Sequence, residues 1–228
     1  MIKLAVFDMA GTTVADDNFV RKAFQNAFSI NGYDVDPDQI YPLMGYKKID
    51  AIKIVLDESG EDYSMDTVDG IHTDFVKEMI DFYEFNPEVK PLRNAEDIFQ
   101  ELKEKGVRIA LNTGFPKSIA DTIIHRLQWK QRGLVDDYIA SDEVEEGRPN
   151  PFMIMELMRR AGVADAAMVA KIGDTPVDIE EGKNSGCGYV IAVTTGAATR
   201  HELEAHYPTH IIDDLSELIP LLHLSNGH

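Results

Sequence analysis

The stretch Val6-Phe7-Asp8-Met9-Ala10-Gly11-Thr12-Thr13 decides how the rest of the chain is interpreted. It begins inside the first apolar run of the sequence, and Asp8 follows that run directly, just before a Gly-Thr-Thr turn. A carboxylate at the tip of a buried strand is well placed to act as an exposed nucleophile. The residue two positions later is Ala10, where an acidic partner would be usual, so the sequence supplies no proton-transferring side chain there.

Length and composition limit the classes of protein that fit. The chain has 228 residues, 44% of them hydrophobic, which predicts one sizeable core with a smaller appended unit. Its 40 acidic and 22 basic residues give a net charge of -18, so we expect neither nucleic acid nor a membrane surface as a partner. We find neither a long apolar segment nor a signal-peptide pattern and expect a cytoplasmic protein. The single Cys187 excludes an intrachain disulfide.

The apolar runs alternate with amphipathic helical stretches, which predicts an α/β fold with a Rossmann-like parallel sheet and helices on both faces. We expect a helix over Asn94 to Lys105, with Asn94 at its N-cap and Gly106 just past its end. Pro116 and Pro176 fit the first turns of two more helices. The predicted strands are Ile2 to Phe7, Val107 to Leu111, Tyr138 to Ala140, Met168 to Ile172 and Tyr189 to Val193.

The segment from Ala15 to Glu84 differs from the rest of the chain. It contains three or four helical patterns and no apolar run comparable to the predicted strands. We therefore expect a helical insertion over residues 15–84, placed after the first strand. Residues 1–14 and 85–228 are expected to form the core that carries the sheet.

Polar residues follow three of the predicted strands: Asp8, Asn112-Thr113-Gly114, and the run from Gly173 through Asp174 to Asp178. The carboxyl ends of parallel strands line one crevice, so these residues can converge. Asp8 and Asp174 could share a Mg²⁺ ion, which prefers hard oxygen ligands, and Ala10 could add its backbone carbonyl. Each residue also has a simpler interpretation, because a lone aspartate or threonine at a strand end is commonly a helix cap.

Two further features favour an anion site over a set of caps. Thr113 and Gly114 lie where a strand meets a helix start, so a hydroxyl and free backbone N–H groups would face an anion. Arg148, in Gly147-Arg148-Pro149, would add a forked cation, although an isolated arginine is more often a solvated surface residue. The occurrence of all these groups in order after successive strands favours a functional site.

These segments resemble the four motifs of the haloacid dehalogenase superfamily, over the whole chain. The resemblance implies that Asp8 is a nucleophile that attacks phosphorus and that residues 15–84 are a helical cap over the site. It also implies a Mg²⁺ site and a set of phosphate-binding residues. The implied metal ligands are Asp8, Ala10, Asp174 and Asp178, and the implied substrate-binding residues are Thr12, Gly45, Lys48, Thr113, Gly114 and Arg148.

With alanine at position 10, the chain resembles the phosphonoacetaldehyde hydrolase family, whose members cleave a phosphorus–carbon bond. In that family a cap lysine forms a protonated Schiff base with the substrate aldehyde, and the imine accepts the electrons of the broken bond. The loop Met44-Gly45-Tyr46-Lys47-Lys48-Ile49-Asp50 resembles the cap loop of the family and aligns Lys48 with this lysine. Two other interpretations remain open, namely a solvated pair of lysines and a Lys48 that binds an anion as a plain cation.

Two residues depart from that family. Ala51 replaces a histidine three residues after the lysine, and Phe115 replaces a tyrosine two residues after the motif threonine. The leading hypothesis is a Mg²⁺-dependent hydrolase that cleaves a small phosphonate through Asp8 and Lys48. The departures support the alternative of a phosphomonoesterase acting on a small phosphate. A binding protein without activity on the same fold is a third possibility, and a homodimer formed through the cap is compatible with all three.

Overall fold

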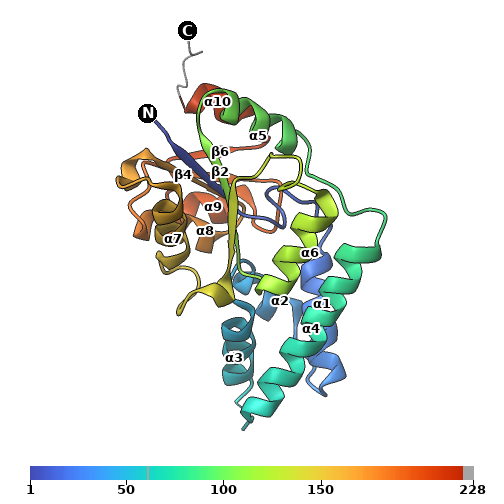
Figure 1. The fold of residues 1–228 in the computed structure, drawn as a ribbon. Coiled ribbons are helices and arrows are strands. Elements are labelled where there is room, and N and C mark those ends of the chain that lie inside the picture. The colour runs from blue at the N-terminus through green and yellow to red at the C-terminus, as the bar shows by residue number, and fades with distance from the viewer. Residues whose placement is uncertain (61, 223–228) are drawn as a thin grey trace.

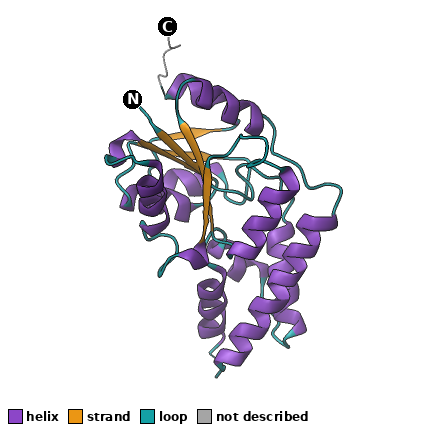
Figure 2. Cartoon of the chain, viewed as in Figure 1, coloured by secondary structure: helices purple, strands orange, loops and turns teal. Residues whose placement is uncertain are grey.

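A six-stranded parallel sheet forms the centre of the protein in a computed structural model that describes residues 1–60 and 62–222 (Figures 1 and 2). The strand order is β3-β2-β1-β4-β5-β6, so the chain builds one half of the sheet from β1 outward and then crosses to the other half. This confirms the predicted α/β class. The strands are β1 Leu4–Phe7, β2 Arg108–Thr113, β3 Asp137–Ala140, β4 Val169–Gly173, β5 Tyr189–Val193 and β6 His210–Ile212.

All five predicted strands are present, with ends that differ by at most two residues. The sequence analysis missed β6 (His210–Ile212), because this strand has only two apolar residues, which lie between His210 and Asp213. Pro176 is the first residue of α8, as predicted. The prediction for Pro116 is wrong by one position, because this residue has extended backbone angles (φ -70°, ψ 163°) and α6 begins at Lys117.

Helices cover both faces of the sheet, as predicted (Figure 2). The alternation of side chains along β1 explains this, since successive residues of a strand point to opposite faces. Ala5 and Phe7 belong to one apolar cluster with α5, α6 and α10, whereas Leu4 and Val6 belong to another with α7. These helices and their neighbours are α5 Ala95–Glu104, α6 Lys117–Leu127, α7 Phe152–Ala161, α8 Pro176–Asn184, α9 Arg200–Ala205 and α10 Leu218–Leu221. Short 3-10 turns cover Tyr41–Leu43, Ser141–Glu143, Ala166–Met168 and Leu215–Glu217.

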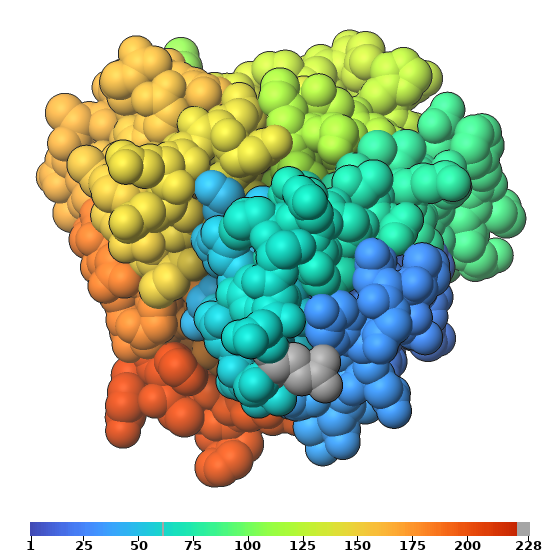
Figure 3. All heavy atoms as spheres, turned by 90° about the horizontal axis from the view of Figure 1, so that it is seen from below, coloured from blue at the N-terminus to red at the C-terminus, as the bar shows by residue number. Residues whose placement is uncertain are grey.

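Four further helices lie between β1 and β2 and form no part of the two layers on the sheet (Figure 1). Helices α1 and α4 pack through aromatic rings, with the centroids of Phe24 and Phe75 5.4 Å apart in an edge-to-face contact. Seen from below, this segment lies in front and covers much of that face of the molecule (Figure 3). The helices are α1 Phe19–Ile30, α2 Pro37–Ile40, α3 Lys48–Ser59 and α4 Met65–Phe85.

The helical segment and the sheet approach each other closely at Gly114, directly after β2. A β-carbon added at this position would collide with the backbone carbonyl oxygens of Gly45 and Tyr46. Glycine at 114 therefore allows the loop before α3 to touch the carboxyl end of β2. Among the residues that the structure describes, none of the helices has the length and apolar character needed to cross a membrane.

Candidate active site

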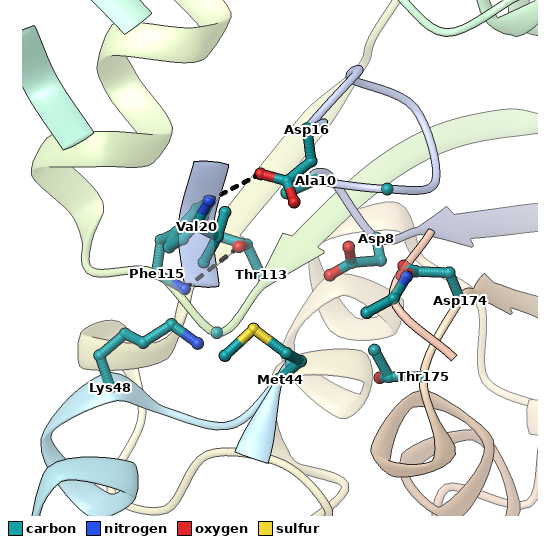
Figure 4. Close-up of a pocket in the computed structure, with 14 residues that line it drawn as sticks. Asp8, Ala10, Asp16, Val20, Met44, Lys48, Thr113, Phe115, Asp174 and Thr175 are labelled. Atoms are coloured by element: carbon teal, nitrogen blue, oxygen red, sulfur yellow. Dashed lines mark hydrogen bonds between the residues drawn. The ribbon is translucent and has the colours of Figure 1, made fainter. Parts of the chain in front are cut away.

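The carboxyl ends of three adjacent strands meet at one pocket. Asp8 follows β1, Thr113 ends β2 and Asp174 follows β4, with β1 in the middle of the three. The order of the strands reverses here, which is where open parallel sheets bind ligands. The pocket has a volume of about 40 Å³, and the helical segment between β1 and β2 supplies part of its wall (Figure 4). Its lining consists of Asp8, Ala10, Gly11, Asp16, Val20, Met44, Gly45, Lys48, Thr113, Gly114, Phe115, Asp174, Thr175 and Ala197.

Seven of the ten residues singled out from the sequence line this pocket. The other three, Thr12, Arg148 and Asp178, are buried beside it and contact the lining residues Asp174, Asp8 and Thr175, respectively. The seven lining residues are Asp8, Ala10, Gly45, Lys48, Thr113, Gly114 and Asp174.

Three buried carboxylates form the acidic part of the site. Oxygen atoms of Asp8, Asp174 and Asp178 all lie within 4.8 Å of one another. Asp174 also accepts hydrogen bonds from the Thr12 hydroxyl (2.8 Å) and from the Ala197 backbone N–H (2.7 Å), which fix its orientation. Three hard oxygen donors at this spacing suit a divalent cation such as Mg²⁺.

The electrostatics of the carboxylates support the same conclusion. Burial raises the pKa of Asp8 to about 6, although the positive charge of Arg148 opposes this effect. Burial also raises the pKa of Asp174 well above its usual range, and the negative charges of Asp8 and Asp178 add to it. Like charges held this close disfavour each other's ionised forms, so a bound cation would offset a repulsion that the fold imposes.

Arg148 is fully engaged by protein groups, which the sequence pattern did not predict. Its Nη1 lies 2.6 Å from Asp8 Oδ1 and 3.0 Å from Asp178 Oδ1, and its Nε donates to Glu181 at 2.9 Å. Its Nη2 donates to the backbone oxygen (2.8 Å) and the side-chain oxygen (2.7 Å) of Asn112. The guanidinium is buried, so these partners replace water around its charge. Arg148 therefore positions Asp8 from behind the pocket.

Lys171 is a second buried cation, and the sequence analysis missed it. Its Nζ lies 2.8 Å from Asp178 Oδ1 and 3.3 Å from Glu181 Oε2, and it donates to Asn112 Oδ1 at 2.7 Å. Burial raises the pKa of Asp178, but the charges of Arg148 and Lys171 outweigh this and leave it lowered. The available signal was a lysine inside the apolar strand Val169–Gly173, because a charge there requires buried partners.

Lys48 brings an amine from the helical segment into the pocket. It is the first residue of α3 and only 2% exposed. Its Nζ lies 5.7 Å from the ring centroid of Phe24 and 5.8 Å from that of Phe115, and it donates to the Tyr46 carbonyl at 3.3 Å. Burial lowers the pKa of this amine to about 8, with the charge of Asp8 acting in the opposite direction. With this pKa roughly a tenth of the Lys48 amine is uncharged at pH 7, and this fraction rises as the pH approaches 8.

The remaining predicted residues shape the backbone around the pocket. The Thr113 hydroxyl accepts the Phe115 backbone N–H at 3.1 Å, so it closes the turn after β2 as a cap would. Gly45 has φ +85°, a backbone conformation suited to glycine, and its carbonyl accepts a long hydrogen bond from Arg148 at 3.4 Å. Both residues thus have a structural role in addition to lining the pocket.

Comparison with known proteins agrees with this fold and site. The model of the haloacid dehalogenase-like hydrolase family matches residues 5–193. Phosphonoacetaldehyde hydrolase from Bordetella pertussis is 26% identical over 97% of this chain and 91% of its own length. A phosphonoacetaldehyde hydrolase-like protein from Oleispira antarctica has a TM-score of 0.85 and 18% identity, covering 97% of this chain and 91% of its own. A protein described as a predicted phosphoglycolate phosphatase from Haemophilus somnus has a TM-score of 0.78 and 17% identity, with coverage of 97% and 98%.

The chain therefore belongs to the haloacid dehalogenase-like hydrolase family. It is a hydrolase with a Rossmann-like core. The two structural likenesses establish the fold, since their sequence identities are low.

Proposed function

We propose that the protein is a Mg²⁺-dependent hydrolase that cleaves the phosphorus–carbon bond of a small phosphonate that carries an aldehyde, such as phosphonoacetaldehyde. The observation that carries this proposal is the buried amine of Lys48 in the same pocket as Asp8, with no acid at Ala10. An amine with a lowered pKa is suited to imine formation. The phosphonoacetaldehyde hydrolases that match most of the chain support the same substrate class.

In this proposal Asp8 attacks the phosphorus atom and becomes an aspartyl-phosphate, which water then hydrolyses. Arg148 holds the Asp8 carboxylate and favours its ionised form. Asp8, Asp174, Asp178 and the carbonyl of Ala10 would hold Mg²⁺, which when bound would neutralise the negative charge that builds up between nucleophile and phosphoryl group. Thr12, Thr113 and Gly114 would complete the surroundings of the phosphoryl group.

Lys48 would form the imine that accepts the electron pair of the broken phosphorus–carbon bond. Its uncharged amine adds to the aldehyde carbon and, after loss of water, forms a protonated imine. When the phosphorus–carbon bond breaks, its electron pair moves into the imine, and an enamine results. The two aromatic rings near Nζ exclude water from this position and keep the amine reactive.

A phosphomonoesterase acting on a small phosphate is the second candidate, and a specific observation favours it. Ala51 and Phe115 are buried and carry no proton-transferring group, where the phosphonoacetaldehyde hydrolase family has a histidine and a tyrosine. Lys48 would then bind the substrate anion as a plain cation. The matching protein described as a phosphoglycolate phosphatase is consistent with this candidate at the level of the fold.

We also propose that residues 15–84 act as a cap over residues 1–14 and 85–228. The support is that Met44, Gly45 and Lys48 of this segment line the same pocket as Asp8 and Asp174 of the core. Gly114 is the contact on which the segment closes. A homodimer formed through the cap stays a prediction.

Trapping of the imine with borohydride tests the function. We expect incubation with phosphonoacetaldehyde and borohydride to inactivate the enzyme and to add a two-carbon group to Lys48, detected by mass spectrometry. Lys48→Arg should abolish both effects. Lys47→Arg is the matched control, because Lys47 is the neighbouring lysine and its Nζ contacts the Val144 and Glu145 carbonyls instead of the pocket.

The same assay decides between the two candidates. If no adduct forms on Lys48 and phosphate is released from alkyl phosphates in a Mg²⁺-dependent reaction, the phosphomonoesterase is correct. Release of phosphate from phosphonoacetaldehyde together with the adduct supports the phosphonatase.

A further inference from the structure

The pocket contains a carboxylate to which neither the sequence motifs nor the proposed function gives a role. Asp16 lies in the loop between β1 and α1 and lines the same pocket as Asp8, Ala10 and Lys48. Figure 4 shows the hydrogen bond from the Val20 backbone N–H to its carboxylate, which overlaps Ala10 in that view. The missing acid at position 10 is therefore accompanied by a carboxylate six residues later that lines the same pocket.

The surroundings of Asp16 favour a group that holds and releases a proton. Burial raises the pKa of its carboxyl, and the positive charge of Lys48 acts in the opposite direction. The negative charge of Asp17 raises the pKa of Asp16 by a smaller amount. The Oδ1 atom accepts the backbone N–H of Val20 at 2.9 Å, which fixes the carboxyl plane at the start of α1.

We propose that Asp16 is the proton-transferring residue of this pocket and performs the step that Ala10 cannot. The proposal rests on the proposed hydrolase function and extends it to the residue that handles the proton. Asp16 belongs to the loop that leads into the helical segment, so its carboxyl is in the pocket when Lys48 is also there.

The step is written here for imine formation. The uncharged Lys48 amine adds to the aldehyde carbon, and one proton moves from nitrogen to the carbonyl oxygen, which gives a neutral carbinolamine. The carboxylic acid of Asp16 then donates its proton to the carbinolamine hydroxyl. The C–O bond breaks, water leaves, and the nitrogen lone pair forms the C=N bond of a protonated imine. Asp16 remains as a carboxylate, which balances the positive charge of the imine.

The same residue would serve a phosphate ester. As the P–O bond breaks, the electron pair goes to the leaving oxygen, and the proton of Asp16 goes to the same atom, so the product is a neutral alcohol. The Asp16 carboxylate can then accept a proton from the water that attacks the aspartyl-phosphate. Both reactions need one proton donor in the pocket.

A purely structural role for Asp16 must be separated from this one, because its Oδ1 also caps α1. Asp16→Asn keeps an oxygen acceptor for the Val20 N–H but removes the exchangeable proton. Asp16→Ala removes both. Asp17→Asn is the matched control, since Asp17 is the adjacent aspartate and is exposed.

The experiment compares these variants on three substrates, namely phosphonoacetaldehyde, ethyl phosphate and p-nitrophenyl phosphate, with Mg²⁺ present. We expect Asp16→Asn to keep the wild-type melting temperature and to slow turnover of the first two substrates by about 10² to 10⁴. Its effect on p-nitrophenyl phosphate should be less than about tenfold, because nitrophenolate leaves without a proton. Asp17→Asn should behave as wild type with all three.

Two results would overturn the proposal while the hydrolase function stands. One is an Asp16→Asn enzyme with wild-type rates on every substrate that the wild type turns over. The other is an equal loss on all substrates with a lowered melting temperature, which indicates a structural cap. If the wild type itself turns over none of the three, the proposed function fails and the role of Asp16 fails with it.

Discussion

The Nη1 atom of Arg148 lies 2.6 Å from Oδ1 of Asp8, and both side chains are buried. This contact explains how the pocket can keep a carboxylate that burial would otherwise protonate. Burial raises the pKa of Asp8 to about 6, and the guanidinium charge is the strongest effect opposing it. The ionised form of Asp8 therefore predominates at neutral pH, as a nucleophile requires.

Replacement of the nucleophile is the first prediction. We expect Asp8→Asn to lower turnover of any phosphorus substrate by a factor on the order of 10³ to 10⁶, since an amide does not attack phosphorus. The variant should also fail to form the aspartyl-phosphate, measured by rapid quench with labelled substrate. Asp17→Asn serves as the control. An Asp8→Asn enzyme that keeps a tenth of the wild-type turnover would exclude Asp8 as the nucleophile.

The second prediction concerns the stability of the buried ion network. Lys171→Met removes one of the two cations that contact Asp178 and Glu181, while the length of the side chain is kept. Loss of one partner from a buried ion pair costs about 3 to 5 kcal/mol, because the remaining charges are left without compensation. We expect a loss of this size in the free energy of unfolding, measured by urea denaturation with and without Mg²⁺.

A surface lysine gives the matched control for that measurement. Lys183 pairs with Glu180 at 3.4 Å, and both side chains are about one third exposed. Exposed pairs of this kind contribute roughly 0 to 1 kcal/mol. Lys183→Met should therefore change the free energy of unfolding by no more than about 1 kcal/mol. Equal effects of the two substitutions would show that the buried network does not stabilise the fold as its distances indicate.

The sequence was sufficient to predict the α/β sheet and the convergence of Asp8, Thr113 and Asp174. Apolar runs followed by polar residues indicate where strands end, and the carboxyl ends of parallel strands lie together at one edge of the sheet. It was not sufficient to show that Arg148 is enclosed by Asp8, Asp178, Glu181 and Asn112. Such pairing depends on packing between segments that are far apart in the chain, for which a linear pattern has no signal.

Asp16 was missed for a different reason. Next to Asp17, in a polar loop after the first strand, it has the pattern of a solvated turn. Only the start of α1 at Phe19 and the contact with the Val20 backbone turn its carboxyl toward the pocket. A helix cap and a pocket residue have the same sequence signature, so three-dimensional placement was needed to separate them.

The third prediction tests the contact between the helical segment and the sheet. Gly114→Ala places a methyl group where the carbonyl oxygens of Gly45 and Tyr46 lie, so the segment cannot reach its present position. We expect kcat/KM to fall by about 10² or more, since misplacement of groups by about 1 Å has effects of this size. The melting temperature should change little if the segment moves as a unit. Unchanged kinetics would show that closure at Gly114 is not needed for the reaction.

The fourth prediction concerns the decrease in the free energy of unfolding that the buried charge of Lys48 causes. Lys48→Met replaces a buried amine by an apolar side chain of similar length, and the pKa of about 8 against the usual 10.5 shows that the folded state disfavours the charge. We therefore expect the variant to be inactive in imine formation but more stable at pH 7 by about 1 to 3 kcal/mol.

The sign of the pH dependence follows from the same shift. Below about pH 8 the amine is protonated in both the folded and the unfolded states, so the penalty for burying its charge is at its full value and does not vary with pH. Between about pH 8 and 10.5 the unfolded state binds more protons, so the free energy of unfolding of the wild type rises relative to Lys48→Met. Urea denaturation at pH 7 and at pH 10 should show the gap between the two proteins narrowing. A gap of constant size would mean that the Lys48 amine is solvated, in which case it would lack the reactivity that imine formation requires.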